Sequence, residues 1–454
     1  MTIEQTAPTM IGPDHARYDE LRKVFNGTVD RRPALIARCT GPEDVATAIG
    51  LAREHGLSVS VFGGGHNVTG NAVCDGGLTI DLRPMKAIEV DPVTRTCRAA
   101  GGVTWGELDA ATQEHGLAVT GGRMSTTGLG GLAVGGGSGW LERSCGYTVD
   151  NLISVEVVTA DGEILTASAD EHADLFWGTR GGGGNFGVVT SFELGLHRVG
   201  PTVLGGMLIY PAAMAAEVLA NFRDVMAHAP DEVGAGVTLT TAPEADFVPE
   251  PVRGRPVVGI IAMYAGPVDE AEEALRPLRE FGPPALDMVQ PMPYLAVQQL
   301  IDADYPTGQR NHWTGDFLTG LPDEAIRILC RFQLTKPSPH TQILVLPGGG
   351  AVARVPDGTM ACGHDRRAPF NLHITSLWTD PGDDEANVAW TRELSAAMKP
   401  FTTGRVYVNF IGDEGEQRVV AAFGGPESYA RLQDLKRRWD PDNLFRFNQN
   451  VRLV

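Results

Sequence analysis

The sequence predicts an α+β protein, with a glycine-rich first half and a second half dominated by one large antiparallel sheet. A chain of 454 residues is longer than a single hydrophobic core usually supports, so two or three domains are expected. Glycine runs concentrate in the first half, at 63–65, 121–139 and 181–187. From about residue 200 to 400, apolar strand-like runs alternate with helical patterns, which is typical of an α+β domain.

Residues 33–60 predict a strand, a helix and a second strand. The apolar run "ALIARC" forms the first strand, and Pro42 suits the first turn of the helix. Apolar residues then recur at helical spacing until "HGL", where Gly56 suits a left-handed helix end. "SVSVF" is the second strand, and the glycine run 63–65 follows it directly.

Further helices, strands and glycine-rich turns are expected in the rest of the first half. Residues 104–117 predict a helix, whereas 120–141 hold too many glycines for one. Residues 151–169 predict a hairpin that turns at Ala160-Asp161-Gly162, and 181–199 end in a strand.

In the second half we expect strands near 204–210, 233–240, 255–264, 341–347 and 371–378. Helices are expected at 212–228, 268–281, 322–334 and 385–398. The segment after residue 404 is polar, aromatic and too short for a core of its own, so it should return to the first domain. The predicted divisions are 1–198, 199–404 and 405–454.

Charge and composition exclude several classes of partner. The net charge of −19 repels phosphate backbones and anionic membranes, so we expect neither nucleic acid nor membrane as a partner. No run of about 18 apolar residues appears, and the N-terminus lacks a secretory pattern. The six cysteines are scattered without a CxxC pair, which favours reduced thiols in a cytoplasmic protein and no metal site.

The glycine runs predict a site for a large ligand that carries a diphosphate. Backbone N–H groups of glycine-rich turns can surround an anion because no side chain blocks its approach. Residues 182–187 satisfy GxGxxG, but the strand-like "VVTSFEL" follows where a dinucleotide fingerprint needs a helix. A Rossmann site is therefore rejected, and the P-loop pattern GxxxxGK[ST] is absent from the sequence.

Five segments in family order resemble FAD-linked oxidases of the vanillyl-alcohol oxidase type, with a PCMH-type FAD domain, and within them the berberine bridge enzyme-like branch. They are "VFGGGHNVTG", "CDGGLTIDLRPM", "GLGGLAVGGGSGWLERSCGYTVDNL", "VVTADGEILTASADEHADLFWGTRGGGGNFGVVTSFEL" and "RWDPDNLFRFNQN". The chain also resembles a bacterial subgroup that tailors antibiotics and other secondary metabolites, which includes enterocin-maturing flavoproteins and mitomycin-resistance oxidases.

The resemblance implies bound FAD, with Gly63–Gly65 as the pyrophosphate loop and His66 joined covalently to the 8α-methyl of the flavin. A neutral imidazole is a nucleophile near neutral pH, which suits that role. The residues that the resemblance assigns to the cofactor are Phe62, Gly63, Gly64, Gly65, His66, Asn67, Ser125, Thr127, Gly128, Gly131, Leu132, Gly135, Gly137, Gly139, Asn151, Gly187, Val189, Asn409 and Asn448.

Three departures from the family pattern bear on chemistry. Met124 stands where many relatives have a second flavin-linked cysteine, and Cys145 does not take its place, so one covalent bond is expected. Phe410 replaces a tyrosine that often serves as the base, which leaves Tyr407 as a candidate base. His312 is either an acid/base on the substrate side or a buried structural histidine; the other ten histidines are expected to be structural or solvated.

The sequence thus predicts a flavin-dependent oxidase, in which substrate hydride passes to the flavin and O2 reoxidises it with release of hydrogen peroxide. A monooxygenase and a non-catalytic flavin or drug-binding protein are the alternatives. Tyr264, Trp313, Phe317 and Trp378 suggest a flat, polyketide-like small-molecule substrate, or belong to the core. A monomer or homodimer is expected.

Overall fold

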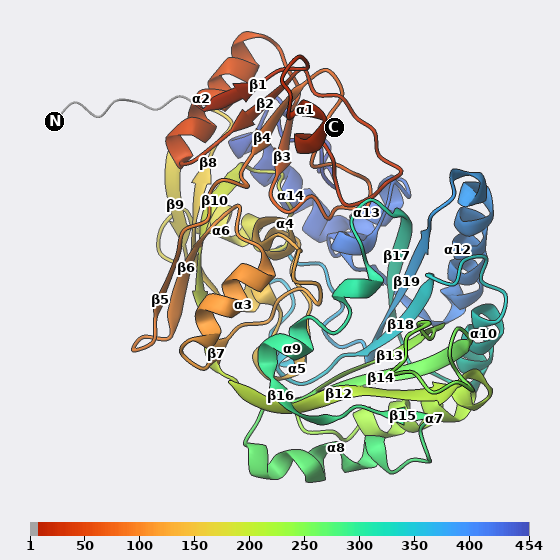
Figure 1. Ribbon diagram of the computed structural model, residues 1–454. Coiled ribbons are helices and arrows are strands. Elements are labelled where there is room, and N and C mark those ends of the chain that lie inside the picture. The colour runs from red at the N-terminus through yellow and green to blue at the C-terminus, as the bar shows by residue number, and fades with distance from the viewer. Residues whose placement is uncertain (1–7, 454) are drawn as a thin grey trace.

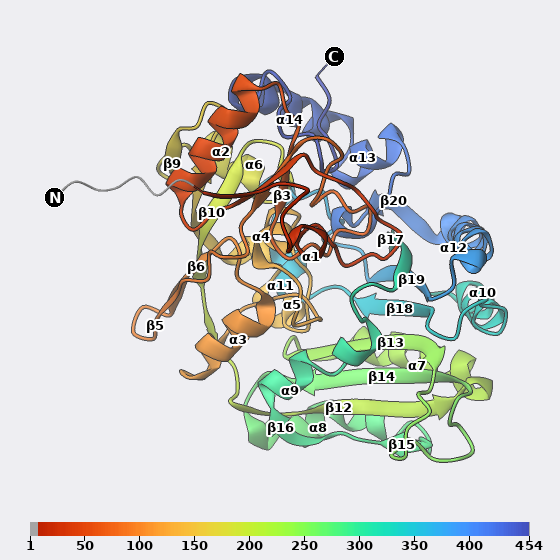
Figure 2. The same cartoon turned by 45° about the horizontal axis from the view of Figure 1, so that its top comes forward.

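Two regions of different architecture lie side by side in the computed structural model, which describes residues 8–453. The first half and the C-terminal helices form one region, and the large sheet with its helices forms the other (Figures 1 and 2). The combination of helices with mainly antiparallel sheets confirms the predicted α+β class.

A small four-stranded sheet carries the first glycine run. Its order is β1 (Thr9–Ile11), β2 (Leu35–Arg38), β4 (Leu78–Asp81), β3 (Val59–Phe62), with β2, β4 and β3 parallel. The helix α2 (Pro42–Glu54) connects β2 to β3, as predicted, and Gly56 has the left-handed φ of +64°. The short helix α1 (Tyr18–Leu21) precedes β2.

A five-stranded antiparallel sheet carries the third glycine run, which leads directly into β10 (Val188–Gly195). Its order is β5 (Ile88–Asp91), β6 (Thr96–Ala100), β10, β8 (Leu152–Val158), β9 (Ile164–Ser168). The predicted hairpin is confirmed as β8 and β9, and Gly162 in its turn has φ of +82°. The predicted helix is α3 (Trp105–Gln113), whose capping box pairs Thr104 with Glu107.

Residues 120–141 correct the prediction, because they contain the helix α4 (Leu129–Val134). Leu129 and Ala133 are both fully buried on one face of this helix, one turn apart. A Cβ at Gly130 would lie 3.1 Å from the carbonyl oxygen of Gly101, so the small residues allow close packing that outweighs the low helix propensity of glycine. The remaining elements here are α5 (Glu142–Cys145), α6 (Ala173–Thr179), and the strand pair β7 (Leu117–Ala118) and β11 (His197–Arg198).

The second half forms an antiparallel sheet of nine strands. Its strands are β15 (Leu286–Asp287), β12 (Thr202–Pro211), β14 (Pro256–Tyr264), β13 (Val233–Thr241), β18 (Gln342–Pro347), β19 (Phe370–Trp378), β17 (Arg310–Leu318) and β20 (Thr402–Val406), in that order, with β16 (Gln290–Pro293) pairing β12. The sequence prediction missed β17 and β20, whose polar residues hide the strand pattern.

Helices cover the face of the large sheet that lies away from the first half (Figure 1). They are α7 (Ala215–Met226), α8 (Ala271–Arg279), α10 (Asp323–Gln333) and α12 (Asp384–Met398), all four as predicted. Their apolar residues share one buried core with the sheet.

The C-terminal segment lies against the first half (Figure 1). It contains α13 (Glu416–Ala422) and α14 (Pro426–Trp439), of which the sequence prediction named neither. Tyr429, Leu432 and Leu435 of α14 belong to the same buried cluster as Phe192 of β10. We keep the divisions 1–198, 199–404 and 405–454 as a proposal, and note that β20 crosses the second boundary.

Candidate functional site

The three glycine runs of the first half converge on one cavity, which also touches the large sheet and the C-terminal segment. The sequence-assigned residues that line it are Gly63, Gly64, Gly65, His66, Asn67, Thr127, Gly128, Gly131, Leu132, Gly135, Gly187, Val189, Asn409 and Asn448, together with the candidate base Tyr407.

Five sequence-assigned residues lie outside the lining of this cavity and hold its loops instead: Phe62, Ser125, Gly137, Gly139 and Asn151. The ring of Phe62 faces the guanidinium of Arg83 at 3.9 Å, and Ser125 donates a hydrogen bond to Asp302. Asn151 donates to the carbonyl oxygens of Cys145 and Tyr147 at 2.9 Å each.

The two glycines Gly137 and Gly139 serve close packing of the loop that precedes α5. A Cβ at Gly137 would lie 2.2 Å from Oγ1 of Thr148, and one at Gly139 would lie 1.9 Å from the carbonyl oxygen of Gly121. Both positions therefore exclude side chains for reasons of packing, not of direct contact with a ligand.

Bare backbone faces the cavity on two sides. A Cβ at Gly64 would lie 2.2 Å from the backbone nitrogen of Gly128, so the first and second glycine runs pack backbone on backbone. At Gly131 and Gly184, by contrast, an added Cβ would meet nothing within 4 Å. Such open backbone can accommodate the close approach of a large ligand and donate N–H groups to its anionic part.

His66 presents a free nitrogen in this cavity. Its Nε2 lies 2.9 Å from Oγ1 of Thr126, and its buried Nδ1 has no hydrogen-bond partner. The imidazole stacks on the ring of Phe25, with centroids 4.3 Å apart. Burial lowers the pKa of His66 to about 4, which keeps the imidazole neutral and able to act as a nucleophile at neutral pH.

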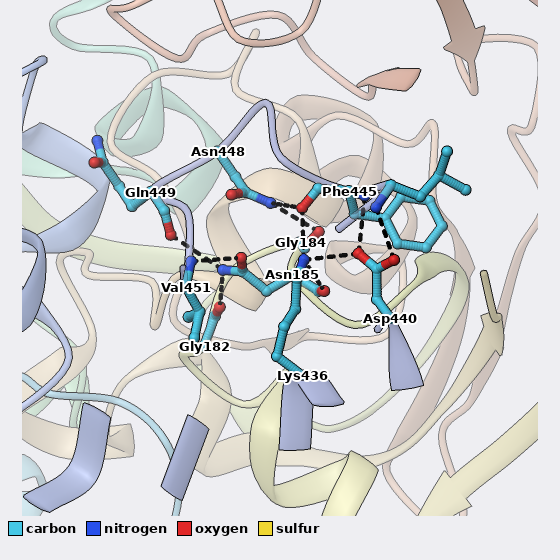
Figure 3. A network of polar contacts seen from close by, with 10 residues as sticks. Gly182, Gly184, Asn185, Lys436, Asp440, Phe445, Asn448, Gln449 and Val451 are labelled. Atoms are coloured by element: carbon cyan, nitrogen blue, oxygen red, sulfur yellow. Dashed lines mark hydrogen bonds and ion pairs between the residues drawn. The ribbon is translucent and has the colours of Figure 1, made fainter. Parts of the chain in front are cut away.

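The C-terminal segment supplies one wall of the cavity through a buried polar network (Figure 3). Lys436 and Asp440 are both fully buried and form an ion pair at 2.7 Å. Nζ of Lys436 also donates to the carbonyl oxygens of Asn185 and Phe445, at 2.8 Å each. Nδ2 of Asn448 donates to the carbonyl oxygen of Gly184 at 2.9 Å. The network therefore fixes the third glycine run against the chain end.

A series of rings leads from His66 toward the large sheet. Phe25, next to His66, meets the ring of Trp313 edge-on at 5.6 Å, and Trp313 stacks on Phe410 at 5.2 Å. Phe410 in turn stacks on His373 at 3.9 Å. Trp313, His373 and Phe410 all line the cavity, so this end offers flat apolar surfaces.

Tyr407 lies at the same end with its hydroxyl held by N–H donors. The hydroxyl oxygen accepts hydrogen bonds from the backbone N–H of Ser138 at 3.1 Å and from Nδ2 of Asn409 at 3.3 Å. Burial raises the pKa of Tyr407 to about 12, while the two hydrogen bonds and the positive charge of Arg123 act in the opposite direction. The geometry fits a phenol that holds a proton and can exchange it with a ligand.

The structure places His312 on the wrong face of β17 for a substrate-side role. Trp313 faces the cavity, so His312 points to the opposite face with Thr314 and Asp316, which bond Arg418 of α13. Burial lowers its pKa, and nearby Arg392 of α12 acts in the same direction. The strand register therefore supports the second interpretation of His312, as a buried structural histidine.

His373 is the histidine that the sequence prediction missed. It lies opposite Gly315 in the β17–β19 ladder and lines the cavity. Its only sequence signal is the strand-like run around it, where cavity-facing and helix-facing positions look alike because both are buried. Of the predicted substrate-side aromatics, only Trp313 lines the cavity; Tyr264, Phe317 and Trp378 belong to the core.

Residues 8–453 contain neither a metal-binding group of side chains nor a membrane-spanning helix. No group of histidine, cysteine and carboxylate side chains there has the arrangement to hold a metal ion. No helix in that range has both the length and the hydropathy to cross a membrane.

Comparison with known proteins identifies the class. Residues 33–168 match the family model of the FAD binding domain, and residues 406–452 match that of berberine and berberine-like proteins. An FAD-linked oxidoreductase of Dictyostelium discoideum is 30% identical over 441 residues, with 96% of this chain and 92% of the relative covered.

A 6-hydroxynicotine oxidase is among the relatives in both sequence and structure. (R)-6-hydroxynicotine oxidase of Paenarthrobacter nicotinovorans is 31% identical over 456 residues, covering 97% of this chain and 96% of that protein. The crystal structure of 6-hydroxy-D-nicotine oxidase from Arthrobacter nicotinovorans superposes with a TM-score of 0.87 at 28% identity, over 100% of this chain and 99% of that one.

The chain belongs to the berberine bridge enzyme-like family of FAD-linked oxidoreductases, and its fold is that of the PCMH-type oxidases. The residues present fit FAD: open glycine backbone suits a diphosphate, and the free nitrogen of His66 lies in the same cavity.

Proposed function

We propose that the protein is an oxidase that holds FAD covalently through His66 and passes the electrons of a small organic substrate to O2. The observation that carries this proposal is the buried Nδ1 of His66, which lacks a partner in the cavity where the glycine runs meet. Bound FAD supplies the two-electron redox chemistry. Covalent attachment would form a C–N bond in place of one hydrogen of the 8α-methyl and one of the imidazole, and O2 would accept the two electrons and two protons as hydrogen peroxide.

A single covalent bond is proposed. Met124 lines the cavity, and a thioether cannot form the second link. Cys145 does not line the cavity, and burial raises the pKa of its thiol, which disfavours the nucleophilic thiolate. None of the cavity-lining residues is a cysteine.

The chain's own residues would then bind, orient and exchange a proton with the substrate. Trp313 and Phe410 stack on one another and both line the cavity, so they would form an apolar wall beside a flat molecule. Tyr407 would accept the substrate proton as the phenolate, after giving up the proton that its raised pKa of about 12 keeps on the neutral phenol. The N–H groups of Ser138 and Asn409 and the charge of Arg123 stabilise that phenolate. Tyr407 is 1% exposed, so bulk water has little access to its hydroxyl group.

The substrate class follows from the same surfaces, and we propose an aromatic, secondary-metabolite or polyketide-like compound. The alternatives are a monooxygenase and a non-catalytic flavin-binding protein; Phe410 favours the second of these, because it removes a candidate base. We also propose a cytoplasmic protein, because all six cysteines are free thiols. A monomer or homodimer is proposed as its assembly.

The test is a screen of aromatic and polyketide alcohols against the purified yellow protein. An oxidase bleaches under anaerobic conditions with its substrate, recolours in air and releases peroxide. With ¹⁸O2 the label appears in peroxide for an oxidase and in the organic product for a monooxygenase. A protein that keeps its colour with every compound, yet binds some of them, would be a flavin-dependent binding protein instead.

A further inference from the structure

At the end of the cavity beside the large sheet, three buried side-chain nitrogens have no hydrogen-bond partner. Nε of Arg123, Nε1 of Trp313 and Nε2 of His373 are all buried without a partner, and all three residues line the cavity. Burying a polar group without a hydrogen bond costs free energy, so a ligand that supplies acceptors there is favoured.

Arg123 is fixed in place by its other nitrogens. Its side chain is 10% exposed; Nη1 donates to Oγ of Ser138 at 2.9 Å, and Nη2 donates to the carbonyl oxygen of Gly139 at 3.2 Å. Glu142 lies 3.5 Å from Nη2, but its carboxylate already accepts from Ser138 and Gly139 and does not line the cavity. The Nε–H of Arg123 thus remains free for a ligand.

The charge of the lining is compatible with such a ligand. Its residues include neither aspartate nor glutamate nor lysine, and Arg123 is its one guanidinium, although the whole chain carries a net charge of −19. Burial, helped by the nearby Arg123 charge, holds the pKa of His373 well below its usual value, so this ring is neutral. Glu142 pairs with Arg123 from behind the lining, so the corner formed by Arg123, Trp313 and His373 carries little net charge. Its unpartnered N–H groups on Arg123 and Trp313 are what favour acceptor oxygens over a cationic donor.

This end of the cavity lies largely outside the FAD-binding match. Trp313 and His373 come from β17 and β19, whereas the matched FAD domain covers residues 33–168. Arg123 is the member of the corner that the FAD domain supplies. The corner thus joins the flavin side of the cavity to the sheet that faces the substrate.

We propose that the substrate is a planar aromatic compound bearing acceptor oxygens, either a carboxylate or an ionised ring hydroxyl, and that Arg123 and Trp313 bind those oxygens. The ring of such a compound would lie against Phe410 and Trp313 while its oxygens meet the free N–H groups. This inference rests on the proposed function, which makes this cavity the reaction site.

The test compares two probes of one ring system on the flavin-loaded full chain. Calorimetric titration at pH 7.5 measures the affinities of 2-naphthoate, which carries acceptor oxygens, and of 2-naphthylmethylammonium, which carries a cationic donor. We expect 2-naphthoate to bind at least about tenfold more tightly, since a hydrogen bond to a charged group contributes about 1.5–3 kcal/mol.

Variants assign that preference to the corner. Arg123→Met should weaken 2-naphthoate about tenfold or more, and Trp313→Phe, which keeps an aromatic face but removes the N–H, should weaken it severalfold. Arg98→Met is the matched control, because Arg98 lies on β6 with its side chain 52% exposed and paired with Glu193. The control should bind 2-naphthoate like the wild type.

Equal binding of the two probes by the wild type, or an unchanged 2-naphthoate affinity in both corner variants, would overturn the proposal. If Arg123→Met does not fold, the wild-type comparison and Trp313→Phe still decide. Titration measures binding without turnover, so a protein that selects 2-naphthoate but never releases peroxide would contradict the oxidase proposal alone.

Discussion

At the scale of single residues, Tyr407 is the group best placed to exchange a proton with a ligand. We expect Tyr407→Phe to slow flavin reduction about 10²–10⁴-fold, the usual contribution of a positioned acid or base, because the hydroxyl held by Ser138 and Asn409 is lost. Anaerobic stopped-flow absorbance with the best substrate from the screen measures this rate.

Tyr429→Phe is the control for that measurement. The Tyr429 hydroxyl also accepts a backbone N–H, from Arg452 at 3.0 Å, but it lies on α14 and does not line the cavity. The control should reduce at the wild-type rate. A Tyr407→Phe protein that also reduces at that rate would show that the proton leaves by another route.

The buried, unpartnered ring of His364 leads us to predict that the protein loses stability in acid. His364 is 2% exposed, neither ring nitrogen has a partner, and burial lowers its pKa to about 3. The unfolded chain takes up this proton near pH 6.5, so acidification from there toward pH 3 favours unfolding, by about 1.4 kcal/mol per pH unit for one proton.

Replacing His364 with leucine removes that proton uptake from the unfolded state. The fall in melting temperature from pH 7 to pH 5 should therefore be smaller in His364→Leu than in the wild type, as differential scanning fluorimetry measures. His115→Gln, at an exposed position after α3, should fall like the wild type. Equal falls in all three proteins would refute a role for His364.

At the scale of elements, the register of β17 decides between two histidines. His312 shares the helix-facing side with Thr314, so we expect His312→Ala to change the rate of flavin reduction less than about twofold. The measurement is the same stopped-flow experiment. A slowing of tenfold or more would mean that His312 reaches the reacting groups after all.

A second element-scale prediction concerns the contact between α14 and the third glycine run. Lys436→Met leaves the Asp440 charge buried without its partner, which typically costs about 3–5 kcal/mol. We expect a clearly lower melting temperature and less bound flavin, measured by fluorimetry and absorbance. The double variant Lys436→Met/Asp440→Asn should recover part of both, because it removes the unpaired charge.

An equal loss in the single and double variants would show that packing around Lys436, not the charge pair, holds this wall. A single variant with wild-type stability and flavin content would show that the network in Figure 3 is dispensable.

How far the sequence could predict these elements depends on how local their signals are. The helix α2 was predictable from Pro42, its apolar spacing and Gly56, which all act within the segment itself. The helix α4 was not, since burial of Leu129 and Ala133 against distant chain overrides the glycines. His373 was missed because no local signal distinguishes the cavity face of a strand that is buried on both sides.

At the scale of the whole molecule, the candidate site exists only where three distant parts of the chain meet. The first half supplies the glycine loops and His66, the large sheet supplies Trp313 and His373, and the C-terminal segment supplies Asn448. Most residues that the sequence assigned to the flavin line this cavity, because the glycine motifs are local signals; their contact with FAD stays a prediction. Of the aromatic residues suggested for the substrate only Trp313 lines it, because strand register and inter-domain packing select the residues at that end.

The central claim is that His66 carries the flavin, and the intact mass of the acid-denatured protein tests it most directly. The account predicts that the wild type retains the mass of one FAD, located by peptide mapping on His66, whereas His66→Ala releases its flavin into the supernatant. Flavin that leaves the wild type completely on denaturation, or that maps to Cys145, would contradict the account.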